Sequence, residues 1–392
     1  MPAASRAVAK TRKSIYGRLE SSQEEGEKTM AHVIAEGSDF LLIDLEGEYL
    51  SLSTSGCPKA YEDVKYLAFK RVPKDFERVD LDAYCREASR SMGVDIHETV
   101  IFLTAVDLKG YSRSSYSYGG SNAEAFVTYG VDSPSCFEGK GREIGTINVA
   151  VILDKPMSKV GLLDVFRTVS EIKGMAFSLG GPMCPSHSSV GTASDATMVA
   201  SPAGEERFGG TATEVGISAS MAVLKALSQQ MASTPVNEYA AKTLGFKDLD
   251  EIVEIAMKAY GKAPVPSLND EEVEKEIGEE MSALWRDPNL RIIVRSARLA
   301  ESFLSLGLFP GNEVDEYKRD SAGIIADEAL GKAIAEYVNG FRGLLAYYWI
   351  DRIKKSDKDL EELDRLPPMT DDVVGAIIGG VLSRIYDRHS RK

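Results

Sequence analysis

Apolar and polar positions follow two different patterns along the chain, and the first half carries short apolar runs bounded by Gly, Ser or Pro. Such runs predict strands over 99–106, 123–131 and 146–153. The apolar segment 40–54, with Glu46-Gly47 at its centre, predicts a strand hairpin. Residues 80–93 have the pattern of a capped helix, and apolar residues at helical spacing predict helices over 159–177 and 214–231.

The second half shows no strand pattern after Ser233-Thr234-Pro235 and consists of helical segments separated by prolines. In 270–281, Val273, Ile277 and Met281 recur every four residues, so the acids between them are predicted to form a solvated helix face. The expected fold class is therefore two domains: a mixed α/β (or α+β) sheet domain over 31–234 and an all-α domain over 235–392. Residues 1–30 are expected to be a flexible tail.

Charge and hydropathy limit the expected partners. Sixty acidic residues against 46 basic ones give a net charge of −14, which disfavours nucleic acid and anionic membranes as partners but does not exclude a local basic pocket for one phosphate group. The apolar runs 343–350 and 373–382 are shorter than the roughly 20 residues of a membrane span. Without a secretory signal, a cytoplasmic location is expected. Only three Gln and seven Asn are present, a bias seen in thermophile proteins.

The four cysteines, Cys57, Cys85, Cys136 and Cys184, form no CxxC pair and lie far apart. We therefore expect reduced thiols, with neither a zinc site nor a disulfide framework. The four histidines are equally scattered and are assigned no role.

Three polar segments stand against apolar neighbours in the first half: 145–149, 170–173 and 191–197. A buried polar side chain must be paired or functional, since an unsatisfied one costs on the order of 1–3 kcal/mol. One interpretation is structural, with Asn148 and Asp195 tying strand ends to turns and Glu171 and Lys173 decorating a helix. The other is a catalytic site.

In this order, the three segments resemble the adenosylcobinamide amidohydrolase family, together with 76–95, 100–107 and the FGGTATEVG stretch from Phe208. The resemblance covers about 40–232 and implies hydrolysis of the amide between the aminopropanol arm and the corrin ring. It implies no organic cofactor, because the corrinoid is the substrate. The candidate residues are Asn148, Glu171, Lys173, Thr192 and Asp195 for catalysis, and Gly191 and Ser194 for substrate binding.

Amide cleavage needs a base and donors for a developing oxyanion. Asp195 or Glu171 could act as the base, while Lys173, Asn148 and the 191–194 backbone could stabilise negative charge. The chain differs from its relatives over 128–140, where Cys136 is inserted.

Two acidic pairs stand out in the helical half, Asp327-Glu328 and Asp371-Asp372, and each leads an apolar helix. Four carboxylates brought together require a cation, and oxygen ligands favour Mg²⁺. The alternative is that Asp371 and Asp372 only favour a helix N-terminus behind Thr370.

Nearby residues extend this candidate site. Asp351, Arg352 and Lys354 could orient the metal and hold phosphate oxygens. Glycines near the acids would let helices approach closely or leave room for a ligand: Gly331, Gly375, Gly379 and Gly380.

The segments 327–331, 351–354 and 371–375 resemble the α-ribazole-5′-phosphate phosphatases, which are similar to phosphatidylglycerophosphatase A. This resemblance implies removal of phosphate from α-ribazole phosphate or from the corresponding cobalamin phosphate, with Asp327, Glu328, Asp371 and Asp372 as metal ligands. Together the two halves resemble a bifunctional hydrolase of cobalamin biosynthesis or salvage. The alternative is that only the phosphatase is active and the first domain binds a corrinoid without cutting it.

Overall fold

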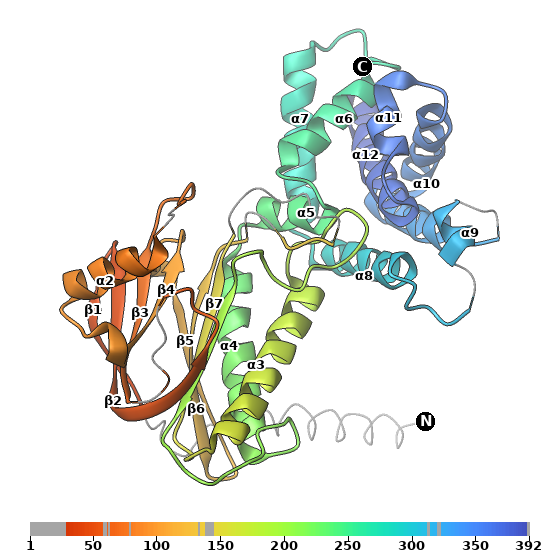
Figure 1. Cartoon of the computed structure of the whole chain (residues 1–392). Helices are drawn as coiled ribbons and strands as arrows, with labels where there is room; N and C mark the ends of the chain where they lie inside the picture. Colours follow the sequence, from red (N-terminus) through yellow and green to blue (C-terminus); the bar gives the residue numbers. More distant parts are fainter. Residues whose placement is uncertain are drawn as a thin grey trace, which may run out of the picture. The chain divides into compact units, whose positions relative to one another are not determined.

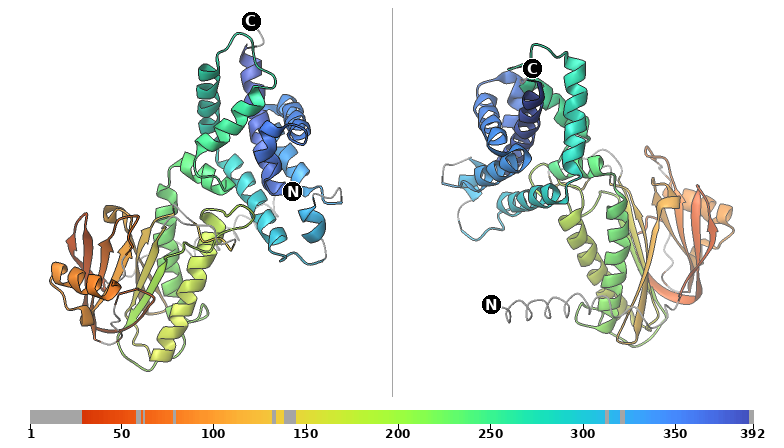
Figure 2. Two further views of the ribbon diagram at one scale, coloured as in Figure 1. Left: turned by 45° about the horizontal axis from the view of Figure 1, so that its top comes forward. Right: turned by 180° about the vertical axis from the view of Figure 1, so that it is seen from behind.

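The computed structural model describes residues 29–57, 61, 63–77, 80–131, 134–137, 145–311, 314–319 and 323–389. They form two compact units (Figures 1 and 2). Unit 1 contains the described residues before 132, those of 145–176 and those of Val190–Ala232. Unit 2 contains the described residues of 134–137, Phe177–Ser189 and 233–389. Of the tail expected over 1–30, residues 1–28 lie outside the described residues.

Unit 1 has the predicted mixed α/β architecture. Its eight-stranded sheet has the order β4-β3-β2-β8-β7-β6-β5, with β1 also paired to β2. Neighbouring strands are antiparallel except β3 with β4 and β7 with β8. The strands are β1 (His32–Glu36), β2 (Phe40–Ser53), β3 (Val64–Arg71), β4 (Thr99–Thr104), β5 (Ser112–Tyr118), β6 (Ser121–Tyr129), β7 (Ile147–Leu153) and β8 (Ala196–Ser201).

The predicted hairpin over 40–54 is wrong, because β2 runs through as one strand. Glu46 takes a positive φ of 54°, and the pairing with β3 shifts register between Asp44 and Tyr49. Beyond this irregularity β2 pairs with β8 from Leu50 onward. The Glu46-Gly47 pair is therefore a bend at which the strand changes partner.

The bend folds the sheet into two halves that face each other and enclose a core. Leu41, Phe69 and Phe102 from one half pack with Phe126 and Met198 from the other. Helix α2 (Leu81–Met92) covers the outer face of the β1–β4 half, and helices α3 (Lys159–Gly180) and α4 (Glu214–Ser233) cover the β5–β8 half (Figure 1).

The predicted start and end of α2 are confirmed. The Asp80 side chain accepts a hydrogen bond from the Ala83 N–H, and Gly93 ends the helix in the left-handed conformation with φ 74°. Both devices could be recognised from the residue types alone, because Asp caps helix starts and Gly tolerates a positive φ.

Unit 2 is helical, as predicted. Val273, Ile277 and Met281 are buried on α7, and Asn269 forms a capping box with Glu272 at its start. The helices are α5 (Val236–Leu244), α6 (Leu249–Tyr260), α7 (Asp270–Trp285), α8 (Pro288–Ser305), α9 (Val314–Lys318), α10 (Ala326–Lys354), the short η3 (Lys358–Leu360), α11 (Glu361–Asp364) and α12 (Pro368–His389).

Helix α12 is buried along most of its length, and α10 lies against it. A Cβ atom at Gly379 would lie 2.7 Å from the Tyr347 backbone N, and one at Gly380 would lie 2.5 Å from a Val338 methyl carbon. These two glycines therefore allow the close helix approach that the sequence predicted.

Helix α10 reverses direction at Asn339-Gly340. Gly340 has φ 57° and ψ −146°, outside the helical region, so two helical halves meet at this point. In one straight helix Asp327 and Asp351 would lie about 36 Å apart, at 1.5 Å per residue. Instead the halves pack together, since a Cβ at Gly331 would lie 2.8 Å from the Tyr347 hydroxyl oxygen. The reversal brings both ends of α10 to the same end of α12.

The expectation of reduced cysteines is wrong. Cys57 is bonded to Cys85 and Cys136 to Cys184, with Cα–Cα distances of 5.5 and 5.7 Å. The partners are separated by 28 and 48 residues, so only the tertiary fold brings them within the reach of a disulfide.

Among the described residues, none of the helices combines the length and apolar character needed to cross a membrane.

Candidate functional site

The polar segments predicted in the first half converge in unit 1, where the start of β7, helix α3 and the loop before β8 meet. Asp195 stands in the turn just before β8, and its side chain is 10% exposed. One carboxylate oxygen accepts hydrogen bonds from the Ile147 N–H at 2.9 Å and from the Thr192 hydroxyl. The other accepts from the Lys173 ammonium at 2.9 Å. We call Lys173, Thr192 and Asp195 the unit 1 triad.

The loop backbone is shaped to let this carboxylate approach. A Cβ atom at Gly191 would lie 2.2 Å from Asp195 Oδ2, so a larger residue would displace the carboxylate. Ser194 donates to the Gly145 carbonyl oxygen at 2.7 Å and contacts the Thr146 hydroxyl at 2.9 Å. Gly191 and Ser194 therefore hold the turn that presents Asp195.

Glu171 and Lys173 point to opposite sides of α3, because two positions along a helix differ by about 200° in direction. The Glu171 side chain is 54% exposed and pairs with Arg167 at 2.6 Å. Lys173, with an 11% exposed side chain, pairs with Asp195. The structure thus brings Lys173 to the triad and leaves Glu171 outside it.

Asn148 is fully buried on β7, beside the triad segment. Its Nδ2 donates to the Leu103 carbonyl oxygen and to the Thr128 hydroxyl, each at 3.3 Å. Both amide hydrogens are thus used within the fold, whereas the buried Asn148 Oδ1 has no hydrogen-bond partner among the described residues.

In unit 2, the two helix starts that carry the acidic pairs meet. One carboxylate oxygen from each of Asp327, Glu328 and Asp372 lies within 4.8 Å of the others. Asp327 and Asp372 are buried and Glu328 is exposed. Asp371, the fourth predicted ligand, is not part of this group of three and pairs with Lys354 instead. We call the four residues the acidic cluster.

Lys354 supplies the ammonium beside the acidic cluster. It is 4% exposed and lies 2.8 Å from Asp351 and 3.8 Å from Asp372, and it contacts Asp371 directly. Arg352 is exposed. Lys354 and Asp351 therefore join the cluster as the sequence suggested, and Arg352 lies on the surface of α10.

The environment makes the clustered acids hard to ionise. Burial raises the pKa of Asp371 to about 7 and that of Asp372 to about 6, although Lys354 opposes both shifts. The hydrogen bond to Asp327, followed by burial, raises the pKa of Glu328 to about 7. Burial lowers the pKa of Lys354, but the charges of Asp371 and Asp351 outweigh it and raise that pKa.

One buried oxygen of the acidic cluster lacks a partner. Asp371 Oδ2 accepts from Lys354, whereas Asp371 Oδ1 has no hydrogen-bond partner among the described residues. Hard cations such as Mg²⁺ prefer carboxylate oxygens as ligands. The donor set and the unsatisfied oxygen both fit such an ion.

Sequence reasoning missed Tyr347, which is 1% exposed and donates a hydrogen bond to Asp372. Its hydroxyl also lies where a side chain on Gly331 would stand. The signal available in the sequence was the Asn339-Gly340 pair, since Asn-Gly marks chain reversals. Placing a turn there would have brought Tyr347 back toward Gly331.

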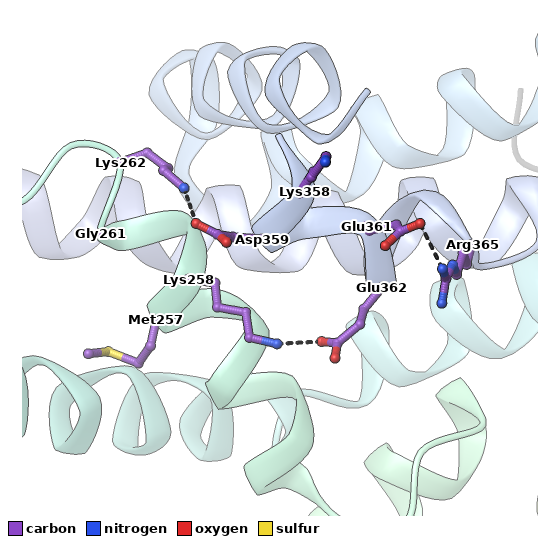
Figure 3. Close-up of a pocket in the computed structure, with 9 residues that line it drawn as sticks. All are labelled: Met257, Lys258, Gly261, Lys262, Lys358, Asp359, Glu361, Glu362 and Arg365. Carbon is purple, nitrogen blue, oxygen red and sulfur yellow. Dashed lines mark hydrogen bonds and ion pairs between the residues drawn. The ribbon is translucent and has the colours of Figure 1, made fainter. Parts of the chain in front are cut away.

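A pocket of ≈ 570 Å³ elsewhere in unit 2 is lined mainly by charged side chains from α6, η3 and α11 (Figure 3). Lys262 pairs with Asp359, Lys258 with Glu362, and Arg365 with Glu361. These pairs neutralise one another, so the pocket offers little excess charge for binding an ion.

Comparisons with known proteins give one family match. The model of the CbiZ family, adenosylcobinamide amidohydrolase, matches residues 24–235, which is 212 of the 392 residues. A search of curated proteins gives no match.

Solved structures similar to part of the chain include three bacterial proteins, each with a TM-score of 0.33. A protein of unknown function from Bacillus stearothermophilus is 21% identical and covers 41% of this chain and 98% of its own. The low temperature requirement C protein from Listeria monocytogenes is 19% identical, covering 40% and 98%. Protein ypjQ from Bacillus subtilis is 19% identical, covering 40% and 96%.

Proposed function

The chain belongs to the adenosylcobinamide amidohydrolase family, and from this premise we propose that unit 1 hydrolyses adenosylcobinamide to adenosylcobyric acid and aminopropanol, with the unit 1 triad as its catalytic centre. The observation that carries the assignment to these residues is the shielded pairing of Lys173 with Asp195 at 2.9 Å. It joins two of the segments on which the family resemblance rests.

The triad contains the groups that amide hydrolysis needs. The Asp195 carboxylate accepts a proton from the attacking water as its oxygen bonds to the amide carbon. The Lys173 ammonium offsets the negative charge that develops on the former carbonyl oxygen. The C–N bond then breaks as Asp195 passes the proton taken from water to the departing nitrogen, and aminopropanol leaves as the amine while the corrinoid keeps the new carboxyl group.

Thr192 contributes through its hydroxyl contact with Asp195 and its 2.7 Å hydrogen bond to the Gly145 carbonyl oxygen. These contacts fix the carboxylate relative to the loop. Thr192 therefore orients the base.

Product analysis in water enriched in ¹⁸O tests this function. Adenosylcobinamide incubated with the protein should yield free aminopropanol and adenosylcobyric acid with one ¹⁸O in its new carboxylate. Binding of adenosylcobinamide without release of aminopropanol would instead make unit 1 a corrinoid-binding module.

For unit 2 we propose a second activity, removal of phosphate from α-ribazole 5′-phosphate or the corresponding cobalamin phosphate, with Mg²⁺ held by Asp327, Glu328, Asp371 and Asp372. The carboxylate oxygens of Asp327, Glu328 and Asp372, which lie within 4.8 Å of one another, support this proposal most directly, and the unpartnered Asp371 Oδ1 is a further oxygen at the same helix start. A bound Mg²⁺ would neutralise charge on the transferring phosphoryl group. Asp351 would hold the Lys354 ammonium beside the acids, where its positive charge offsets part of their negative charge.

Phosphate release from α-ribazole 5′-phosphate, followed against Mg²⁺ concentration, tests the second activity. Release should saturate with Mg²⁺ and stop when a chelator is added. Absence of phosphate release at every Mg²⁺ concentration would remove this activity without affecting the proposal for unit 1.

A further inference from the structure

A buried polar network lies directly beside the first turn of α12, which carries two members of the acidic cluster. It consists of Arg298 and Glu301 on α8, Tyr317 on α9 and Thr370 on α12. The first, second and fourth are 0% exposed and Tyr317 is 1% exposed. We propose that Tyr317 is a positioning residue for the acidic cluster, acting through this network on the start of α12. This inference rests on the proposed metal site of unit 2.

The Tyr317 hydroxyl links two elements through two hydrogen bonds. It donates to Glu301 Oε1 at 3.0 Å and accepts from the Met369 N–H at 3.1 Å. Met369 stands in the first turn of α12, two residues before Asp371. The N–H groups of a helix start have no partner within the helix, so this bond satisfies one of them and fixes its position.

Thr370 carries the second attachment. Its hydroxyl donates to Glu301 Oε2 and receives a hydrogen bond from Arg298 Nη1. Two consecutive residues of α12 are thus held immediately before Asp371-Asp372. Both attachments end on Glu301, so this carboxylate, together with Arg298, holds the first turn of α12.

Arg298 anchors Glu301 in turn. It pairs with this carboxylate and donates to the backbone carbonyl oxygens of Thr243 at 3.1 Å, Cys184 at 2.7 Å and Pro185 at 2.9 Å. A guanidinium whose N–H groups all have partners has little freedom to shift. The position of Glu301, and through it that of α12, is fixed by backbone on three sides.

Stability alone gives a weak reason for such a network. Replacing a buried ion pair with apolar residues of similar volume is often neutral or stabilising, because removing two charges from water is costly. The network lies close to the acids, because it holds Met369 and Thr370, the two residues directly before Asp371. A role in setting the geometry of these carboxylates accounts for its placement.

Binding of Mn²⁺ to the full-length protein, measured by the loss of its free-ion electron paramagnetic resonance signal, tests the proposal. Tyr317→Phe keeps the ring and removes both hydrogen bonds. Changes beyond the direct ligands of a metal cost roughly 10–100-fold in affinity, and we expect Tyr317→Phe to raise the Kd for Mn²⁺ by about 10-fold or more.

Tyr260→Phe is the matched control. Tyr260 is also 1% exposed in the core of unit 2, and its hydroxyl accepts from the Val265 N–H at 2.9 Å. It should bind Mn²⁺ as the unmodified protein does. Thr370→Val should weaken binding as Tyr317→Phe does, and Thr370→Ser, which keeps the hydroxyl, should restore it.

The outcomes of these Mn²⁺ measurements distinguish the positioning role of Tyr317 from the metal site itself. Unchanged Mn²⁺ affinity in both Tyr317→Phe and Thr370→Val overturns the positioning role and leaves the metal site standing. An equal loss in Tyr260→Phe also overturns it, because any loss of core packing would then have the same effect. Failure of the unmodified protein to bind Mn²⁺ overturns the metal site itself and the positioning role with it.

Discussion

The two candidate sites differ in how far the chain satisfies its own charges. In unit 1, the Asp195 carboxylate receives an ammonium, a backbone N–H and a hydroxyl, so each oxygen has a partner. In unit 2, the single ammonium of Lys354 faces Asp351, Asp371 and Asp372, and the carboxyls of Asp327 and Glu328 stand close by.

The proposed functions relate this difference to two kinds of chemistry. In the proposed function of unit 1 the triad acts on a neutral amide without a metal, whereas a surplus of carboxylates needs protons or a cation. The raised pKa values of Asp371 and Asp372 show that, without a cation, protonation of these acids is favoured. The predictions below test whether the unit 1 triad works alone and whether the acidic cluster requires a metal.

The largest effect is expected for Asp195→Ala. Loss of a general base typically costs about 10²–10⁴-fold in rate, and aminopropanol release should fall by about 10³-fold or more, while phosphate release is kept. Glu171→Gln is the matched control, since Glu171 is an exposed acid on α3 paired with Arg167. If Asp195→Ala folds normally and keeps its amidohydrolase rate, Asp195 is not in the site.

Asp327→Asn and Asp371→Asn should each lower phosphate release and leave aminopropanol release intact. A lost ligand should cost more than the roughly 10–100-fold of an indirect contact. Asp270→Asn removes an acid from the start of α7 outside the cluster and should cost at most about 1 kcal/mol of stability. Full turnover in both cluster variants, with unaltered Mg²⁺ dependence, would argue that these acids only favour helix starts.

The acidic cluster should make the metal-free protein less stable as the pH rises. Asp371 and Asp372 have folded-state pKa values of about 7 and about 6, above those of an unfolded chain. Between about pH 4 and pH 7 the folded state binds more protons than the unfolded state, so the free energy of unfolding falls with pH, on the order of a few kcal/mol.

Thermal unfolding at several pH values, with and without Mg²⁺, measures this effect. Mg²⁺ should raise Tm more at about pH 8 than at about pH 5, because it competes with protons for the same oxygens. Asp372→Asn should flatten the metal-free profile. A Tm that rises steadily with pH in the metal-free protein would contradict the assignment.

A smaller effect is expected from the turn that joins the halves of α10. Gly340→Ala forces a side chain into a backbone conformation that costs roughly 1–3 kcal/mol. Gly278→Ala is the matched control, because its Cβ would meet no other atom within 4 Å and Ala is favoured in a helix by roughly 0.5–1 kcal/mol. Denaturant unfolding should show opposite signs for the two variants; equal effects would remove the special role of Gly340.

Sequence reasoning located the elements that depend on local patterns. The cap of α2, the periodicity of α7 and the buried run of β7 are each determined by residues close together in the chain. The acidic pairs were also visible, because each opens an apolar helix. These features can be read without knowing what packs against them.

The remaining features depend on contacts between distant segments. Strand β2 reads as a hairpin because its bend at Glu46 is recognisable only once its second partner, β8, is known. The two disulfides require Cα atoms that only the tertiary fold brings together. Glu171 was grouped with Asp195 by composition, whereas the direction of α3 turns it toward solvent.

Parallel assays of one protein preparation, with and without a chelator, test the contrast between the two sites most directly. Aminopropanol release from adenosylcobinamide should continue unchanged when the chelator is present. Phosphate release from α-ribazole 5′-phosphate should stop and return when Mg²⁺ is added back. Loss of aminopropanol release on chelation would contradict the account of unit 1, and chelator-resistant phosphate release would contradict that of unit 2.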